Sequence, residues 1–289
     1  MRVVMTDLKQ NAPILGSPAI IPRDGRYLHN QRLGKIVELD ESQMDKQFLY
    51  YLLNTYKVRS QLKATATGAT VKHTAPDRIY AVEVDVPPAH TQRKIASILS
   101  AYDDLIENNT HRIAILEEMA QLLYREWFVH FRFPGHEDVA MVDADTRRLG
   151  LNRDFAHLSV IPEGWELRRL GDVAQRFRRG ADPEDLPEDT PYIGLGHMPK
   201  RSIALSEWGS ASETKSRKYR FEQGEILFGR IRPYFHKVGV APVDGVCSTD
   251  ILVIQAEKPK YYSLVLGCVS SGMFVDYATQ TSSGTKMPR

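Results

Sequence analysis

Basic side chains are concentrated between Lys215 and Lys237. This stretch holds seven lysines and arginines against two acidic residues, a local charge of +5, whereas the whole chain carries +2. Lysine and arginine neutralise phosphates, and the forked arginine side chain can meet guanine O6 and N7 together. Arg230 and Arg232 lie two apart beside an expected strand, which would place both guanidinium groups on one face. The chemistry that this stretch favours is contact with DNA.

Candidate DNA-contacting residues occur in both halves of the chain. Cations near turns and strands are expected to bind phosphates, and His73 and His236 lie beside cations, where an imidazole could donate to phosphate or base acceptors. Each residue taken singly also fits an ordinary solvated surface. The complete set of candidates is Lys9, Arg23, Arg32, Lys72, His73, Arg217, Lys218, Arg230, Arg232, His236, Lys237 and Lys286.

Motifs for catalysis or cofactor binding are not found in the sequence. Val86-Pro87-Pro88-Ala89 lacks the amide and the aromatic residue that an adenine methyltransferase uses to hold a flipped base. Gly194-Leu195-Gly196 lacks the third glycine of a dinucleotide loop. Cys247 and Cys268 are too few for a zinc site and are expected to be core thiols. We therefore expect a non-catalytic chain without a metal or cofactor.

An apolar heptad pattern runs without interruption from Thr91 to Phe133. Its period of 3.5 residues, sustained over nearly five heptads between Pro87-Pro88 and Pro134-Gly135, favours one long coiled-coil helix. Asn109 is the strongly polar position, and a buried amide there would select register and orientation; the alternative is a locally solvated position. The residues expected to pair with another helix, called the seam below, are Ile95, Leu99, Tyr102, Ile106, Asn109, Ile113, Leu116, Ala120, Leu123 and Trp127.

Two diverged copies of one module flank this helix. Strand, turn and helix patterns between Val3 and Lys72 recur in the same order between Ile226 and Lys286. The predicted fold class is α+β, with two small mixed α/β domains, both incomplete, joined by one long coiled-coil helix. We expect the first domain at 1–90, the helix at 91–133, a linker at 134–164 and the second domain at 165–289.

Targeting signals are not apparent in the sequence. No apolar stretch reaches the roughly 18 residues of a membrane span, and no apolar signal-peptide region follows Met1-Arg2. A cytoplasmic location is therefore expected.

Several segments resemble conserved parts of type I restriction-modification DNA specificity subunits. The segments 91–96, 103–109, 116–120, 124–129 and 131–135 are similar to that family's conserved helix and its end. Trp165-Glu166-Leu167 with Leu170-Gly171-Asp172 resembles the opening of its target-recognition domain. Met5-Thr6-Asp7-Leu8 and the segment 283–289 resemble interior motifs of that domain.

The resemblance implies two target-recognition domains that each read half of a bipartite double-stranded DNA site, held apart by two antiparallel helices. It also implies modification subunits that methylate adenine with S-adenosylmethionine, and restriction subunits that cleave DNA using ATP. The catalytic activities would belong to these partners. A full subunit has two complete domains and two helices, whereas this sequence has one helix and two domains that look trimmed at the ends of the chain.

Three functions stay open at this stage. The first is a sequence-specific DNA-binding subunit. The second is an interaction remnant that docks modification subunits, or self-associates, without reading DNA. The third is a nuclease, although the carboxylates at Asp77, Glu83 and Asp85 lack a nearby lysine. Because the seam would otherwise be exposed, we also expect a homodimer of antiparallel helices.

Overall fold

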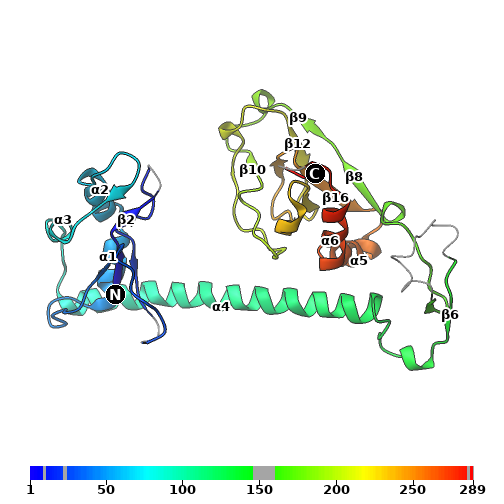
Figure 1. Cartoon of the computed structure of the whole chain (residues 1–289), viewed down its shortest axis with the longest axis horizontal. Helices are drawn as coiled ribbons and strands as arrows, with labels where there is room; N and C mark the ends of the chain where they lie inside the picture. The colour runs from blue at the N-terminus through cyan, green and yellow to red at the C-terminus, as the bar shows by residue number, and fades with distance from the viewer. Residues whose placement is uncertain (9–10, 22–24, 146–159, 285–286, 289) are drawn as a thin grey trace. The chain divides into compact units, whose positions relative to one another are not determined.

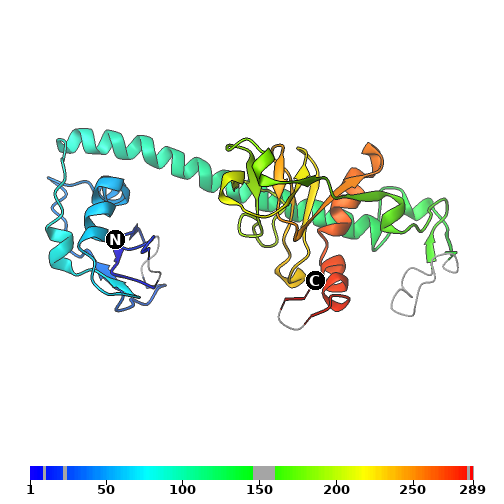
Figure 2. The ribbon, with the colours of Figure 1, turned by 90° about the horizontal axis from the view of Figure 1, so that it is seen from above.

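A computed structural model describes residues 1–8, 11–21, 25–145, 160–284 and 287–288 (Figures 1 and 2). The chain divides into two compact units, Met1–Thr110 (unit 1) and His111–Arg289 (unit 2), and helix α4 (Ala89–Phe128) begins in the first and ends in the second. Mixed helices and sheets with a 40-residue helix confirm the predicted α+β class. The predicted domain boundaries stay predictions. Among the described residues, no helix is long and apolar enough to cross a membrane.

Unit 1 is built on a small antiparallel sheet. Its central strand β1 (Arg2–Val4) pairs with β3 (Pro18–Ala19) and with β4 (Leu33–Lys35), while β2 (Thr6–Asp7) pairs separately with β5 (Lys72–His73). Helices α1 (Lys46–Asn54) and α2 (Tyr56–Ala64) follow, and the short α3 (Pro76–Tyr80) precedes α4. The core cluster consists of the buried side chains Val3, Leu53, Val58 and Leu62.

Unit 2 contains two packed sheets. The antiparallel sheet has the order β14 (Val238–Val240), β13 (Ile226–Gly229), β16 (Ile251–Ala256), β8 (Ala174–Phe177). The other has the order β11 (Gly209–Ser210), β10 (Pro191–Ile193), β15 (Gly245–Cys247), β12 (Lys218–Phe221), β9 (Gly180–Ala181), with β10 and β15 parallel. Helices α5 (Tyr262–Val269) and α6 (Gly272–Gln280) complete the unit.

The central strand β13 is buried on both faces. Ile226 and Phe228 pack in a cluster with Val265 of α5, whereas Leu227 packs in a second cluster with Phe221 of the other sheet. An unbroken apolar run, rather than an alternating one, is the pattern expected of a strand that is covered on both sides.

The two units repeat the same order of elements. Each has a central strand between two antiparallel partners and then two helices, and one constant offset relates the starts of both helices, Lys46 to Tyr262 and Tyr56 to Gly272. The same offset relates Gly68 to Gly284, which follow α2 and α6 and are both left-handed (φ 102° and 103°). The predicted repeat is confirmed, with two helices after the strands where one was expected.

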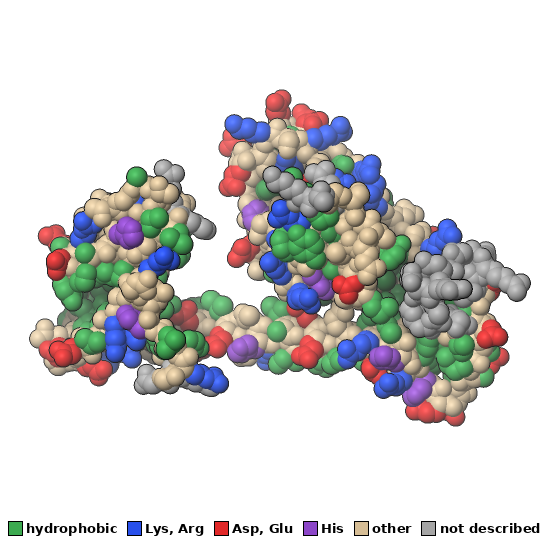
Figure 3. Space-filling model, in the orientation of Figure 1, with side chains coloured by type: hydrophobic (Ala, Val, Ile, Leu, Met, Phe, Trp, Pro, Cys, Tyr) green, Lys and Arg blue, Asp and Glu red, His purple; other side chains and the backbone are tan. Residues whose placement is uncertain are grey.

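Helix α4 buries little of its own surface. Gln92 and Ala96 are its buried residues, and every large apolar seam side chain keeps more than a third of its surface exposed, from 37% for Ile95 to 64% for Ile106. Figure 3 shows hydrophobic side chains at the surface along this helix. The predicted seam is therefore present and accessible, but its pairing stays a prediction.

The helix ends at Phe128, before the predicted end at 133. Phe128, Phe131 and Phe133 all pack around Trp165, with ring centroids 5.1 to 5.7 Å apart, and Phe131 adopts a left-handed backbone (φ 58°). This aromatic packing competes with continuation of the helix. Beyond it, β6 (Met141–Asp143) pairs with β7 (Val160–Pro162) within the predicted linker.

A buried amide attaches the start of α4 to unit 1. Gln92 Nε2 donates to the carbonyl oxygens of Gln43 (2.8 Å) and Pro87 (2.9 Å), and its Oε1 accepts from the Asp45 amide (2.9 Å). Only 1% of Gln92 is exposed. Water therefore cannot replace these hydrogen bonds without opening the packing.

Replacing Gln92 with leucine should loosen unit 1. Because three partly buried backbone groups lose their partner, we expect the free energy of local opening to fall by about 2 kcal/mol. Hydrogen exchange of the α1 and α2 amides measures this change directly. Gln31→Leu, at an exposed position of the same unit, is the control. Unchanged exchange in Gln92→Leu would contradict the anchoring role.

Candidate nucleic-acid interface

The connection from β13 to β14 carries most of the predicted cations of unit 2. Arg232 and His236 have left-handed backbones (φ 50° and 52°), and so does Arg201 (φ 58°), whose amide donates to the His236 carbonyl at 2.9 Å. These are three of the five non-glycine residues with positive φ in the described part of the chain. Such costly conformations persist where surrounding contacts enforce them, and they gather at functional sites.

Cations surround one aromatic ring at this place. The Lys200 ammonium lies 4.4 Å and the Arg232 guanidinium 5.9 Å from the ring centre of Phe235, and the half-exposed Tyr234 lies 4.8 Å from Phe235 between ring centres. We call the residues Lys200, Arg201, Arg232, Tyr234, Phe235, His236 and Lys237 the Phe235 cluster. Figure 3 shows basic side chains beside hydrophobic ones on the visible face of unit 2. Cations next to aromatic rings are suited to phosphates and bases.

Arg230 and Arg232 are not arranged by strand alternation as predicted. Strand β13 ends at Gly229, and the left-handed backbone of Arg232 breaks the two-residue period. Arg230 Nη2 lies 3.4 Å from Asp250 Oδ1 and its buried Nε has no hydrogen-bond partner in the described structure. Arg230 is therefore partly committed to Asp250 and retains a donor that is not used within the described residues.

Three other predicted residues of unit 2 have internal partners. The His236 ring Nε2 lies 2.8 Å from the Ser270 carbonyl oxygen, and the Lys237 ammonium donates to the Leu195 carbonyl. Burial, together with the nearby Lys200 charge, lowers the pKa of Lys237. Lys218 is only 5% exposed; its ammonium donates to Ser216, and burial lowers its pKa. Lys218 and Lys237 are thus less accessible to phosphate than the sequence suggested.

Arg217 is exposed, with its guanidinium packed over Gly180. A Cβ atom at Gly180 would collide with the Arg217 guanidinium, so the absence of a side chain there makes room for this arrangement. Arg217 stays open to solvent and to a phosphate.

Three predicted residues of unit 1 lie next to the segment Met5–Asp7. The Met5 amide donates to the Arg32 carbonyl (2.8 Å), the Thr74 amide donates to the Met5 carbonyl (2.9 Å), and His73 Nδ1 lies 3.0 Å from the Thr6 hydroxyl. Lys72 precedes His73 in β5. The Arg32 backbone and the strand that carries Lys72 and His73 thus both contact the segment Met5–Asp7. The remaining candidates, Lys9, Arg23 and Lys286, lie outside the described residues.

A carboxylate on α4 holds the loop that carries Lys200 and Arg201. Glu117 Oε1 accepts hydrogen bonds from the Ser202 hydroxyl (2.8 Å) and from the Ile203 (2.8 Å) and Ala204 (3.0 Å) amides. Gln121 Nε2 donates to the Ser270 hydroxyl at 2.7 Å. Beside these contacts, a groove of about 660 Å³ is lined by Leu123 and Trp127 of the seam and by side chains of α5.

The described residues contain no group of three His, Cys, Asp or Glu side chains placed to hold a metal ion. Both cysteines are free thiols. Burial raises the pKa of Cys247 to about 12 and also raises that of Cys268. Neither thiol is therefore primed as a nucleophile.

Comparison with known proteins gives consistent matches. Residues 17–118 match the family model described as type I restriction modification DNA specificity domain. The chain is 35% identical to the type I restriction enzyme MjaIX specificity subunit of Methanocaldococcus jannaschii over 128 residues, covering 44% of this chain and 27% of that protein. It is 26% identical to the EcoDI specificity subunit of Escherichia coli over 258 residues, covering 84% and 56%. The chain thus spans about half or less of the length of these relatives.

The chain is similar to type I specificity subunits over parts of its length. A crystal structure of the S subunit of the M. genitalium type I system aligns with 96% of the chain and 64% of that subunit, at 14% identity and a TM-score of 0.47. The similarity to specificity subunits agrees with the resemblance seen in the sequence. The DNA specificity domain match includes Arg32, Lys72 and His73 of unit 1.

Sequence reasoning missed two cations of the Phe235 cluster, Lys200 and Arg201. They lie well before Arg232 in a stretch without local charge enrichment, and only the folded contacts with Phe235 and His236 bring them to the cluster. It also missed Arg59 of α2, which donates to the Pro13 carbonyl (2.6 Å) and to the Ser17 hydroxyl and so braces the loop before β3. No local motif marks either feature.

Removing the Glu117 carboxylate should release the loop at 202–204. Three donors lose a charged acceptor in Glu117→Ala, so we expect the Ile203 and Ala204 amides to exchange hydrogen at least about tenfold faster, which corresponds to about 1.4 kcal/mol. Hydrogen exchange followed by mass spectrometry measures this. Glu118→Ala, at the exposed neighbouring carboxylate, should leave the loop unchanged. Equal effects of the two substitutions would refute the specific role of Glu117.

Proposed function

We propose that this chain is a non-catalytic specificity subunit that binds double-stranded DNA sequence-specifically within a type I restriction-modification complex. Adenine methylation and DNA cleavage would be performed by its modification and restriction partners. The observation that carries the proposal is the match of residues 17–118 to the DNA specificity domain. The names of the relatives, which are specificity subunits, support the same assignment.

The exposed part of the Phe235 cluster is the DNA-contacting surface that we propose in unit 2, because His236 and Lys237 already have internal partners. Lys200 and Arg201 are exposed, and Tyr234 offers a half-exposed ring beside them. Arg230 lies beside the cluster, but its Nη2 is paired with Asp250 and its Nε is buried, so it is less available to DNA. Lysines would set the affinity for phosphates, and arginines with their fixed donor geometry are better suited to read base edges.

Neutralising one cation of the cluster should weaken DNA binding in a salt-dependent way. For Lys200→Gln we expect lower affinity for duplex DNA and a salt slope reduced by about 0.9, the value for one lost phosphate contact. Fluorescence anisotropy with random-sequence duplexes at several salt concentrations gives the slope, and selection from a duplex pool tests sequence preference. Lys258→Gln, an exposed lysine outside the cluster, should match the wild type. If Lys200→Gln and Lys258→Gln reduced DNA binding equally, the proposal that this surface contacts DNA would be contradicted.

A second candidate function is protein association through α4 without DNA reading. It is favoured by the exposed seam, whose eight large apolar side chains are each more than a third accessible. Two antiparallel copies centred on His111 would place Ile106 opposite Leu116 and Leu99 opposite Leu123. The large Tyr102 would then face the small Ala120. This self-complementary register supports a homodimer, and the same helix would dock modification subunits.

An acidic residue in the seam should abolish self-association. In the proposed register, Leu116→Asp buries a carboxylate against Ile106 of the second copy, so we expect a dimer of the wild type to become a monomer at micromolar concentration. Light scattering measures the mass. Ile115→Asp is a closely matched control, because Ile115 is 57% and Leu116 63% exposed but only Leu116 belongs to the seam. A wild-type monomer at micromolar concentration would rule out the homodimer. Absence of DNA binding together with retained dimerisation would favour the second function over the first.

A further inference from the structure

The loop at 200–205 of unit 2 ends on strand β14. The Val240 amide donates to the Ile203 carbonyl (2.9 Å), and Ala204 forms a parallel bridge with Val240. The next residue, Leu205, is 7% exposed and belongs to a core cluster. The sheet thus fixes this segment through the Ile203 carbonyl and the Leu205 side chain, and the Ile203 and Ala204 amides are left for another acceptor.

The acceptor of these two amides is Glu117, in the part of α4 that belongs to unit 2. The same oxygen, Oε1, also accepts from the Ser202 hydroxyl. Donors on three consecutive residues therefore converge on one carboxylate oxygen. Hydrogen bonds to an ionised acceptor are about twice as strong as those between neutral groups. Glu117 thus fixes the residue that directly follows Arg201.

Arg201 has a backbone conformation that a free loop would not keep. Its φ of 58° lies in the left-handed region, which is costly for a residue other than glycine unless surrounding contacts enforce it. Its amide donates to the His236 carbonyl (2.9 Å), and the segment bound to Glu117 follows it directly. In this arrangement the ammonium of Lys200 lies 4.4 Å from the ring centre of Phe235. Both cations are exposed, so the backbone rather than burial sets their position.

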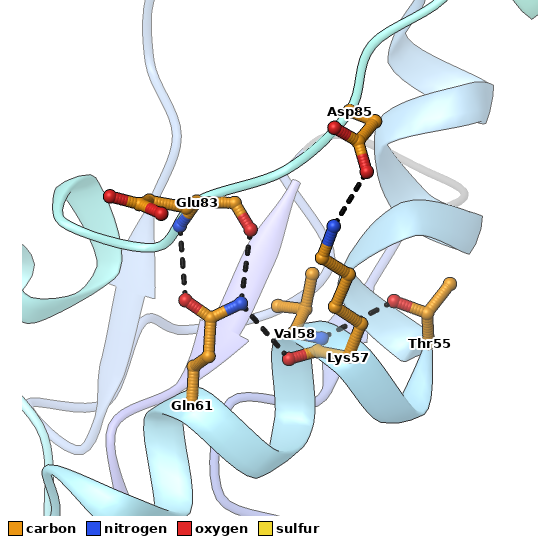
Figure 4. A network of polar contacts seen from close by, with 6 residues as sticks. All are labelled: Thr55, Lys57, Val58, Gln61, Glu83 and Asp85. Carbon is orange, nitrogen blue, oxygen red and sulfur yellow. Dashed lines mark hydrogen bonds and ion pairs between the residues drawn. The ribbon is translucent and has the colours of Figure 1, made fainter.

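A side chain on a helix also holds an irregular backbone segment in unit 1 (Figure 4). Gln61 of α2 accepts from the Glu83 amide through Oε1 (3.1 Å) and donates through Nε2 to the Glu83 carbonyl (3.0 Å). An uncharged amide oxygen is therefore a sufficient acceptor for such a segment in this chain. Glu117 differs because it is negatively charged and because the segment that it binds begins directly after two cations.

On the basis of the function proposed for the exposed part of the Phe235 cluster, we propose that Glu117 is a positioning residue for DNA contact. It holds Lys200 and Arg201 in the place from which they meet duplex DNA. Glu117 is an anion bound next to a surface for a polyanion, so charge alone would make its removal strengthen DNA binding. Positioning instead makes its removal weaken DNA binding. The sign of the effect therefore separates the two roles.

Duplex binding by the full chain at several salt concentrations tests this role. For Glu117→Ala we expect the salt slope to fall by about 0.9, the value for one lost phosphate contact, which corresponds to binding weakened about eightfold at 0.1 M salt. Adding Lys200→Gln to Glu117→Ala should weaken binding little further, because the lysine has already lost its position. Fluorescence anisotropy with a labelled random-sequence duplex measures the wild type, both single variants and the double variant.

Two further variants separate positioning from charge. Glu117→Gln keeps the accepting oxygen without the charge, as Gln61 does for Glu83, and should restore most of the wild-type affinity. Glu118→Ala removes the exposed neighbouring carboxylate and should bind DNA at least as tightly as the wild type. Circular dichroism checks that each variant is folded. Unchanged or tighter binding by Glu117→Ala, or equal losses in Glu117→Ala and Glu117→Gln, would overturn the proposal.

Trypsin reports the position of the loop without DNA. Because a held backbone must open to enter the protease, we expect cleavage after Lys200 or Arg201 to be at least about tenfold faster in Glu117→Ala than in the wild type or Glu118→Ala. Mass spectrometry identifies the fragments. Unchanged cleavage would overturn the positioning role of Glu117. Weaker DNA binding by Lys200→Gln but not by Glu117→Ala would overturn this role alone, whereas no DNA binding by the wild type would overturn the proposed function itself.

Discussion

The uncovered seam of α4 is the constraint on which the other features depend. A helix of 40 residues is only weakly stabilised while its apolar stripe is exposed to water, because burial of apolar surface is what stabilises most amphipathic helices. Here each unit attaches through residues beside the seam, Gln92 and Asp103 in unit 1 and Glu117 and Gln121 in unit 2. These directional hydrogen bonds attach the two units to α4 through side chains outside the seam. They therefore leave the seam residues unburied. The apolar stripe therefore stays exposed.

The long helix and the repeated modules were predictable because their signals are local and redundant. A heptad period repeated over many turns tolerates individual exceptions such as Asn109, and apolar runs such as Ile226–Phe228 mark a buried strand in any context. The helix end was not predictable in this way. The position of the helix end depends on Trp165, which lies far beyond Phe131 in the sequence and packs against three phenylalanine rings.

The candidate interface was only partly predictable, because exposure and backbone conformation decide which cations are available. Lys218 belongs to the most basic stretch, yet it is buried and bonded to Ser216. Arg232 was expected to follow strand geometry, but its left-handed backbone redirects it toward Phe235. Lys200 joins the cluster through tertiary contact alone. A count of charges locates a basic region, whereas the folded contacts determine which of its members face solvent.

The attachment of unit 2 to α4 links the seam to the Phe235 cluster. Glu117 binds the loop directly after Lys200 and Arg201, and Gln121 binds Ser270, whose carbonyl in turn lies 2.8 Å from the His236 ring. The cluster is therefore tied to the helix at two points, on the residues that directly follow Leu116 and Ala120 of the seam. A partner helix that packs on the seam would restrict the motion of the side chains that hold the cluster. If the chain associates and reads DNA as proposed, the two activities would be coupled through a single stretch of α4, because rearranging either surface would disturb charge-assisted or buried hydrogen bonds.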